Sequence, residues 1–295
     1  MDDVIFEFNE LRKKYNISLA YVASELGVSK TKISLWKDKS YKGKTAELTE
    51  QIKNFIQREK ARRTAWQLPI VEISTMQYVR EIAQLCHTRG RIGVCVGSAG
   101  LGKTVAAKEY VKQYPDAILI ESNYSYTARS LLLELHKVLG LSCKGSAYSL
   151  MEEVVEKMTK SGRLIIIDEA ENLRREALEL TRRIHDKTGV GLLLIGREVL
   201  LQNLRGRQNQ YDQLYSRVMY RKNLEGLAKN DVMNIVIGAG LKSDLANVYF
   251  GVCRGNTRRL EHLISNSLSV ATINGNKEVD AAIINETAKM LMDKE

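Results

Sequence analysis

Between Ile70 and about residue 224, short apolar runs alternate with longer segments of helical period. The runs at 92–96 and 164–168 are continuous, as is typical of parallel strands buried on both faces. Strands are predicted at residues 92–96, 117–121, 164–168, 191–195 and 217–221, and helices at 74–88, 103–114, 127–139, 147–160 and 174–186. This alternation predicts an α/β fold with a doubly wound parallel sheet and right-handed crossovers.

The strand pattern stops after about residue 224, and only helical segments follow. Helices are predicted at residues 228–239, 243–253, 257–273 and 279–292. Helices that follow a sheet without further strands suggest a C-terminal helical lid.

Residues 18–38 have the pattern of a helix-turn-helix, in which two short helices meet at a tight turn. Ser18 and Ser29 are candidate N-caps, and Gly27 stands where the turn needs a positive φ. The side chains expected to pack the two helices together are Val22, Ala23, Leu26, Val28, Ile33 and Trp36. A further amphipathic helix is predicted over 48–63, so the N-terminal part is a small all-α domain.

The predicted domains are a helix-turn-helix domain at 1–65, an α/β core at 66–224 and a helical lid at 225–295. We place a linker at about 61–70, because Pro69, one of only two prolines, follows the last helix of the N-terminal part.

The second helix of the helix-turn-helix carries short polar and basic side chains. They are the candidate DNA contacts Ser29, Lys30, Thr31, Lys32, Ser34 and Lys37. We expect Lys30, Thr31, Ser34 and Lys37 to point outward, where they suit phosphates and base edges. The segment resembles the helix-turn-helix of phage repressors; the alternative is a small helical packing module with a solvated basic face.

The charge also favours a polyanionic partner. The chain of 295 residues has a net charge of +10. Residues 1–65 contain 14 Lys and Arg against 9 Asp and Glu, which is half of that surplus. Nucleic acid fits better than a membrane, because no basic amphipathic anchor and no long apolar run is present. The acidic N-terminus and four widely spaced cysteines favour a cytoplasmic protein with reduced thiols.

Residues 97–104 read GSAGLGKT, the spacing of a phosphate-binding P-loop. The strand before it and the helix after it are the context that this motif requires, because the N–H groups of the loop and the helix N-terminus attract an anion. Lys103 is expected to reach the β- and γ-phosphates, and the Thr104 hydroxyl to ligate Mg²⁺. The candidate ATP contacts are Gly97, Ser98, Ala99, Gly100, Leu101, Gly102, Lys103, Thr104 and Val105.

A second string, LIIIDEA at 164–170, places two carboxylates at the end of a buried strand. Ligands sit at the carboxyl ends of strands in open α/β sheets. Asp168 is expected to hold Mg²⁺ through water, and Glu169 to polarise the water that attacks ATP.

With VGLLLIG, LYSRV and GNTRRL following in order, the chain resembles the AAA+ ATPases, and among them the target-DNA activators of Mu-like transposing phages. The resemblance implies ATP-dependent assembly of helical filaments of this protein on double-stranded DNA, with little sequence preference. It also implies that the filament recruits and stimulates a DDE-type transposase, which in turn promotes ATP hydrolysis.

The resemblance assigns further roles. Arg217 matches an arginine finger that reaches the nucleotide of a neighbouring subunit, and Arg258 matches the lid arginine called sensor 2, with Arg259 adjacent. Together with Lys103 and Glu169, Arg217 and Arg258 are the candidate catalytic residues. The sensor 1 position departs from the family, since Arg197 stands where a short polar residue is usual; either it contacts phosphate or it points away.

The resemblance also implies DNA contacts on loops near the second strand of the core. Tyr124, Arg129 and Lys144 are the candidates there. For the tyrosine, ordinary packing or exposure is the alternative. Two other functions stay open for the whole chain: a replication ATPase similar to helicase loaders, and a regulator that binds nucleotide and DNA without catalysis.

We predict that DNA binding weakens steeply with salt, because each phosphate contact releases counterions. The logarithm of the binding constant should fall by about 0.9 per contact for each unit in log salt. Titration of a labelled duplex at several salt concentrations measures this slope, and an affinity that stays flat between low and moderate salt would contradict the prediction.

Overall fold

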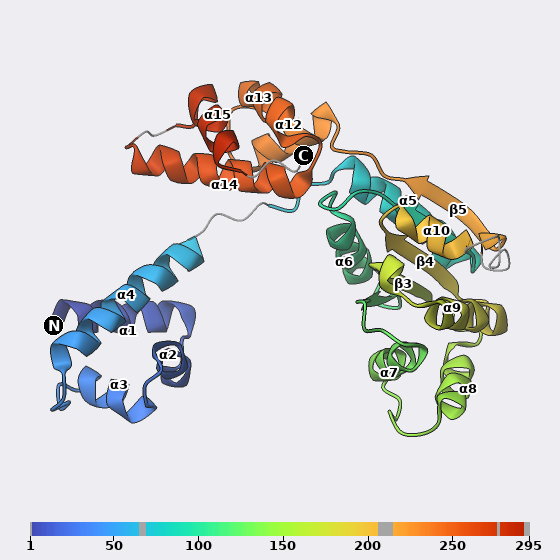
Figure 1. The fold of residues 1–295 in the computed structure, drawn as a ribbon, viewed down its shortest axis with the longest axis horizontal. Helices are drawn as coiled ribbons and strands as arrows, with labels where there is room; N and C mark the ends of the chain where they lie inside the picture. Colours follow the sequence, from blue (N-terminus) through green and yellow to red (C-terminus); the bar gives the residue numbers. More distant parts are fainter. Residues whose placement is uncertain (1, 65–68, 206–214, 276–277, 292–295) are drawn as a thin grey trace. The chain divides into compact units, whose positions relative to one another are not determined.

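The computed structural model describes residues 2–64, 69–205, 215–275 and 278–291 (Figure 1). The chain forms two compact units, Met1–Gln67 and Leu68–Glu295. Among the described residues, no helix combines the length and apolar character needed to cross a membrane.

The N-terminal unit consists of four helices: α1 (Asp2–Tyr15), α2 (Leu19–Leu26), α3 (Lys30–Lys37) and α4 (Thr45–Thr64). The predicted caps are confirmed. The Ser18 hydroxyl accepts a hydrogen bond from Tyr21 N, the Ser29 hydroxyl accepts one from Lys32 N, and Gly27 ends α2 with φ 62°. Helix α1 was not predicted, although Val4, Phe8, Leu11 and Tyr15 lie along it at helical spacing.

Trp36 is the centre of this unit. Its ring is fully buried, meets Phe8 edge-to-face at 5.6 Å, and its Nε1 donates to Thr49 Oγ1 at 2.8 Å. The contacts join α3 to α1 and α4, so the helix-turn-helix does not stand alone. The core around Trp36 comprises Phe8, Leu11, Ile17, Val22, Ala23, Ile33, Leu48, Ile52, Phe55 and Ile56.

The second unit is built on a five-stranded parallel sheet with the order β2-β3-β4-β1-β5. The strands are β1 (Ile92–Val96), β2 (Ile118–Glu121), β3 (Leu164–Asp168), β4 (Gly191–Gly196) and β5 (Val218–Asn223). The expected doubly wound α/β fold is therefore present, with the fifth strand beginning one residue later and ending two residues later than predicted.

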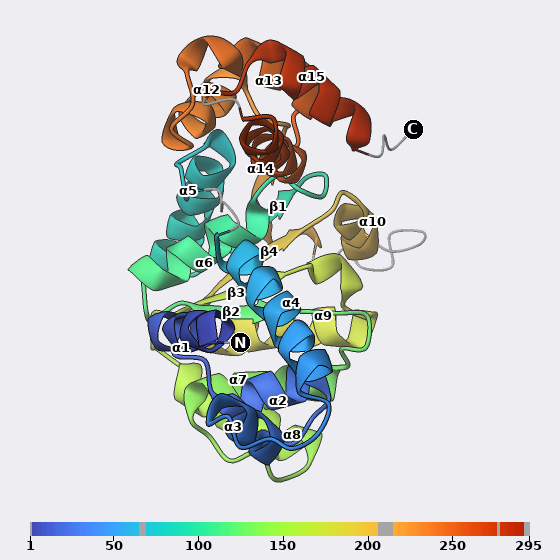
Figure 2. The ribbon, with the colours of Figure 1, turned by 90° about the vertical axis from the view of Figure 1, so that its left-hand side faces the viewer.

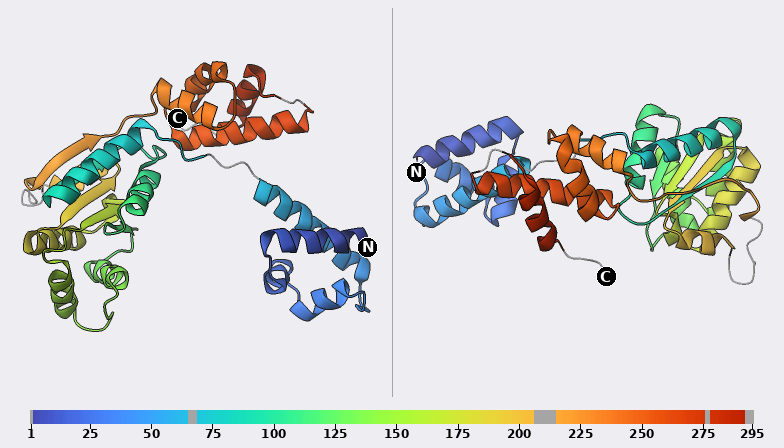
Figure 3. Two further views of the ribbon diagram at one scale, coloured as in Figure 1. Left: turned by 180° about the vertical axis from the view of Figure 1, so that it is seen from behind. Right: turned by 90° about the horizontal axis from the view of Figure 1, so that it is seen from above.

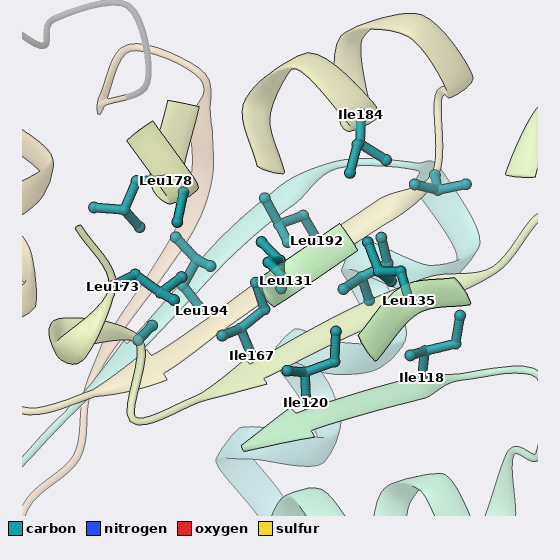
Figure 4. Packing of buried hydrophobic residues seen from close by; sticks show 14 of the residues in the cluster. Ile118, Ile120, Leu131, Leu135, Ile167, Leu173, Leu178, Ile184, Leu192 and Leu194 are labelled. Carbon is teal, nitrogen blue, oxygen red and sulfur yellow. The ribbon is translucent and has the colours of Figure 1, made fainter. Parts of the chain in front are cut away.

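Helices cover both faces of the sheet. One face carries α5 (Ser74–Arg89) and α6 (Lys103–Gln113), which pack side by side (Figure 2). The other face carries α7 (Ala128–Leu139), α8 (Ala147–Met158), α9 (Arg175–Thr188) and the short helix α10 (Val199–Arg205), which was not predicted. Alternate strand residues such as Ile120, Ile167, Leu192 and Leu194 meet Leu131 and Leu135 of α7 in this second layer (Figure 4).

The last four helices gather into a separate group (Figure 3). They are α12 (Lys229–Gly238), α13 (Ala246–Cys253), α14 (Thr257–Ile273) and α15 (Ala281–Met290), with a 3₁₀ turn (Ser243–Leu245) where the prediction began its second helix. The buried carboxylate of Asp231 accepts from Ala228 N at the start of α12, and from the backbone N and hydroxyl of Ser74 at the start of α5. One side chain therefore serves the N-termini of two helices.

We expect Ile33→Ala to lower the unfolding free energy of the N-terminal unit by about 2–5 kcal/mol, because it removes a fully buried side chain beside Trp36. Urea unfolding of the full chain, followed by tryptophan fluorescence, measures the loss. Leu35→Ala on the same helix, at a side chain 41% exposed, is the control and should cost far less. Equal losses for the two variants would contradict the packing described.

Candidate nucleotide site

The loop between β1 and α6 is shaped to hold an anion. Gly100 and Gly102 have φ 81° and 84°, a conformation that side chains disfavour. A Cβ at Gly100 would also lie 2.4 Å from Asn256 Oδ1, so the loop can meet the lid only with glycine at this position. Helix α6 begins directly after the loop, at Lys103, and its N-terminus adds partial positive charge.

Lys103 lies against this loop. Its Nζ donates to Gly97 O at 2.8 Å and to Ser98 O at 2.7 Å. Burial lowers the pKa of Lys103, while the carboxylates of Glu171 and Asp168 oppose that shift. A bound phosphate would oppose it further, so this lysine is suited to an anionic ligand.

Thr104 and Asp168 come together across the site. The Thr104 hydroxyl donates to Asp168 Oδ2 at 2.5 Å, and Oδ1 of the same carboxylate accepts from Glu169 N at 2.9 Å. Asp168 is only 2% exposed at the end of β3. A hydroxyl and a carboxylate are oxygen ligands that Mg²⁺ prefers beside phosphates, so these residues fit the ion. A Mg²⁺ ion held by Thr104 and Asp168 would neutralise part of the negative charge of the phosphates.

Glu169 is exposed beside Asp168, with φ 54° in the left-handed region. The turn is fixed by Ser122, whose hydroxyl donates to the carbonyl oxygens of Asp168 and Glu169 at 3.1 and 2.8 Å. The Glu169 carboxylate accepts from Asn172 Nδ2 at 3.0 Å. Ser122 and Asn172 thus position the predicted water-activating group, and neither was singled out from the sequence.

The loop from Ala99 to Val105 lines one cavity of about 480 Å³ together with Asp168, Glu169 and Asn172. The lid contributes Thr257, Arg258 and Glu261 to its wall. Arg258 is exposed there, whereas Arg259 is turned back, with its Nε donating to Val252 O at 2.9 Å. Of the two adjacent arginines, the structure therefore brings Arg258 to the cavity.

The lid is bonded directly to the P-loop. Asn256 Nδ2 donates to Ala99 O at 2.9 Å, and Thr257 N donates to Gly100 O at 2.8 Å. Asn256 also caps α14, because its Oδ1 accepts from Arg259 N at 3.0 Å. A change in the loop therefore acts directly on the start of a lid helix.

A smaller apolar hollow of about 150 Å³ adjoins the loop. Its wall consists mainly of Pro69, Ile70, Val71, Ile73, Met76, Val105 and Ile235. Such a surface suits the flat face of a nucleotide base. Of these residues, only Val105 was predicted, because isolated apolar side chains before a helix give no phosphate-type motif.

Arg197 follows β4 and lines the larger cavity. Its Nε donates to Glu171 Oε1 at 2.8 Å. From the sequence, Arg197 was expected either to contact phosphate or to point away. The structure favours the first alternative, because the guanidinium lies at the nucleotide cavity.

Arg217 lies elsewhere. Its Nε donates to Asp186 Oδ1 on α9 at 2.7 Å, and it does not line the cavity of its own chain. A role as a finger therefore requires a second subunit and stays a prediction. Leu214 of the same motif lies outside the described residues.

Not all of the candidate DNA-binding side chains on α3 point outward. Lys30 and Thr31 are exposed, but Ser34 and Lys37, expected to point outward, are half-buried like Lys32. Ser34 Oγ lies 3.5 Å from Asp38 Oδ2, and Lys37 Nζ pairs with Asp38 Oδ1 at 3.5 Å, so both turn toward the end of the helix. Ser29 uses its hydroxyl as the N-cap.

Of the candidate DNA-binding residues of the core, Arg129 is bonded to the loop that carries Lys144. Arg129, predicted on a loop, lies on the first turn of α7, where its Nη2 donates to Gly145 O at 3.0 Å and so joins the start of α7 to the loop between α7 and α8. Lys144 is exposed in that loop, and Tyr124 is 84% exposed. The contact with Gly145 engages one terminal nitrogen of Arg129.

A parallel sheet in the order 2-3-4-1-5, a P-loop after β1, acidic residues after β3 and a helical lid define an AAA-type P-loop fold. Residues 86–204 match the family model of an AAA domain. The chain therefore contains an AAA domain, and most of its length is distantly related to transposition protein B of phage Mu and its relatives.

Two curated relatives show the extent of this similarity. The Mu-like prophage FluMu DNA transposition protein B of Haemophilus influenzae is 25% identical over 235 residues, which cover 77% of this chain and 82% of that protein. The ATP-dependent target DNA activator B of Escherichia phage Mu is 26% identical over 219 residues, covering 72% and 70%. The ORC2 protein of Aeropyrum pernix shares the fold, with TM-score 0.60, 15% identity, and coverage of 79% and 71%.

We predict that Asn256→Ala weakens nucleotide binding several-fold, because the P-loop loses its side-chain bond to the lid. The lost cap should also lower stability by about 1 kcal/mol. Asp280→Ala is the matched control, since Asp280 caps α15 through Ile283 N at 2.9 Å without touching the loop. Binding of a fluorescent ATP analogue and thermal unfolding separate the two effects, and similar nucleotide affinities for both variants would contradict the coupling.

Proposed function

We propose that this chain is an ATP-dependent DNA-binding protein that assembles on target DNA and recruits and stimulates a DDE-type transposase. The observation that carries the proposal is the relation to an ATP-dependent target DNA activator over most of the chain. An AAA domain is typical of ATP binding and hydrolysis, and the P-loop and acidic residues meet in one cavity.

In this proposal, Lys103 and the loop hold the phosphates, and Thr104 and Asp168 hold Mg²⁺. Glu169 orients and polarises the water, since its carboxylate is exposed beside Asp168 and fixed by Asn172. Arg258, on the lid, contacts the nucleotide. Hydrolysis depends on assembly, because Arg217 supplies its positive charge to the site of the next subunit.

DNA is bound at two surfaces in this proposal. Helix α3 presents Lys30 and Thr31, and the core presents Tyr124 after β2, Arg129 at the start of α7 and Lys144 between α7 and α8. Lysine, arginine and small polar groups bind the DNA backbone without reading sequence, which fits the net charge of +10. Such contacts suit a protein that occupies target DNA with little sequence preference.

The test is DNA binding with Mg²⁺ and ATP, a non-hydrolysable analogue, or ADP. We expect binding about 5- to 150-fold tighter with ATP than with ADP, the usual range for coupled sites. Anisotropy of a labelled duplex measures affinity, and electron microscopy shows whether filaments form. Equal affinity with ATP and ADP would overturn the proposal, and closed rings in all states would favour a loader-like ATPase.

Glu169→Gln provides a second arm of this test. It should lower ATP turnover by at least about 10²-fold and prolong the DNA-bound assemblies, because the amide cannot accept a proton from water. Glu176→Gln, on the exposed first turn of α9, is the control. Unchanged turnover in Glu169→Gln would favour a regulator that binds nucleotide without catalysis.

A further inference from the structure

The wall of the nucleotide cavity contains an ion pair whose role is not accounted for by the P-loop and metal residues. Glu171 and Arg197 both line the cavity, and Arg197 Nε donates to Glu171 Oε1 at 2.8 Å. The Glu171 side chain is 6% exposed, whereas that of Arg197 is 59% exposed. The carboxylate is therefore the fixed partner and the guanidinium the accessible one.

The neighbouring residues leave space for the Glu171 carboxylate and hold its backbone. Glu171 lies in the 3₁₀ turn Ala170–Asn172 after β3, and its carbonyl oxygen accepts from Asn203 Nδ2 of α10 at 3.0 Å. A Cβ at Gly196 would lie 2.3 Å from Glu171 Oε2, so the carboxylate occupies space that a side chain on β4 would fill. Glycine at 196 and asparagine at 203 together fix the position of Glu171.

The pairing is incomplete, however. Glu171 Oε2 is buried and has no hydrogen-bond partner among the described residues. A buried carboxylate beside a phosphate site is unfavourable unless cations compensate for it. Arg197 is one such cation, and Lys103 is the other, because Glu171 is the strongest of the carboxylates acting on that lysine.

The contact leaves much of the guanidinium available. Arg197 engages Glu171 through Nε, and a guanidinium has five N–H donors, four of them on its two terminal nitrogens. A planar group held at one edge presents the others in a fixed direction, and arginine binds phosphate oxygens well in such a geometry.

We propose that Glu171 positions Arg197 to contact the terminal phosphate of a nucleoside triphosphate, so that the pair sets the preference for ATP over ADP. Arg197 is the phosphate-contacting residue, and Glu171 is a positioning residue that acts through it. The inference rests on the proposed nucleotide-binding function, and it gives the unusual arginine after β4 a specific task.

Equilibrium binding of fluorescent ATP and ADP analogues to the full chain with Mg²⁺ tests this. Arg197→Ala should weaken ATP binding roughly 10- to 100-fold, as expected for loss of charged hydrogen bonds, and weaken ADP binding much less, so that the ATP-to-ADP affinity ratio falls. Glu171→Gln keeps an oxygen acceptor but removes the charge that holds Arg197. It should lower the ATP-to-ADP affinity ratio and raise ADP affinity, since one negative charge leaves the cavity.

Glu152→Gln is the matched control, because Glu152 pairs with Lys187 at 2.6 Å between α8 and α9, away from the cavity. The ATP-to-ADP affinity ratio of Glu152→Gln should equal that of the wild type. Arg197→Lys keeps the charge without the planar fork and should lie between Arg197→Ala and the wild type. Because Arg197 is exposed, Arg197→Ala and Arg197→Lys should both fold. These two variants therefore test the inference even if Glu171→Gln does not fold.

A wild-type chain that binds ATP and ADP alike would overturn the inference, as would an unchanged ratio in Arg197→Ala. Either result leaves the proposed function to its own DNA-binding test. Conversely, a strong ATP preference that Arg197→Ala removes, without any nucleotide effect on DNA binding, would support the inference and overturn the proposed function.

Discussion

The contact between the Thr104 hydroxyl and the Asp168 carboxylate joins the two halves of the nucleotide site. Thr104 stands on the first turn of α6, and Asp168 ends β3, which is separated from β1 in the sheet by β4. The contact requires the parallel order β3-β4-β1 and a helix that starts at Lys103. Because buried residues on both faces of the sheet fix that order, packing far from the phosphates determines whether the oxygen ligands meet.

Much of the site was predictable because its residues are tied to local backbone geometry. GSAGLGKT contains the loop after β1 and the first residues of α6, and LIIIDEA contains β3 and the turn after it. The sequence therefore indicated Lys103, Thr104, Asp168 and Glu169 correctly as neighbours of one cavity. All five strands of the core were likewise predicted, with small errors at their ends, since continuous apolar runs are typical of buried parallel strands.

The rest depends on contacts between distant parts of the chain. Ser122, which directly follows the neighbouring strand β2, holds the turn after β3, and Asn256 reaches the P-loop from the lid. A lone serine or asparagine has no periodic pattern, so neither could be recognised locally. The half-buried state of Ser34 and Lys37 has a local origin instead, because both side chains turn toward Asp38 at the end of the same helix.

Asp231 and Asn256 tie the lid to two different elements of the core. Asp231 bonds to the start of α5, and Asn256 bonds to the P-loop. Each of these side chains also caps a lid helix, Asp231 at α12 and Asn256 at α14. A displacement of the loop at Ala99 would therefore be transmitted first to the N-terminus of α14, and a displacement of α5 at Ser74 to that of α12.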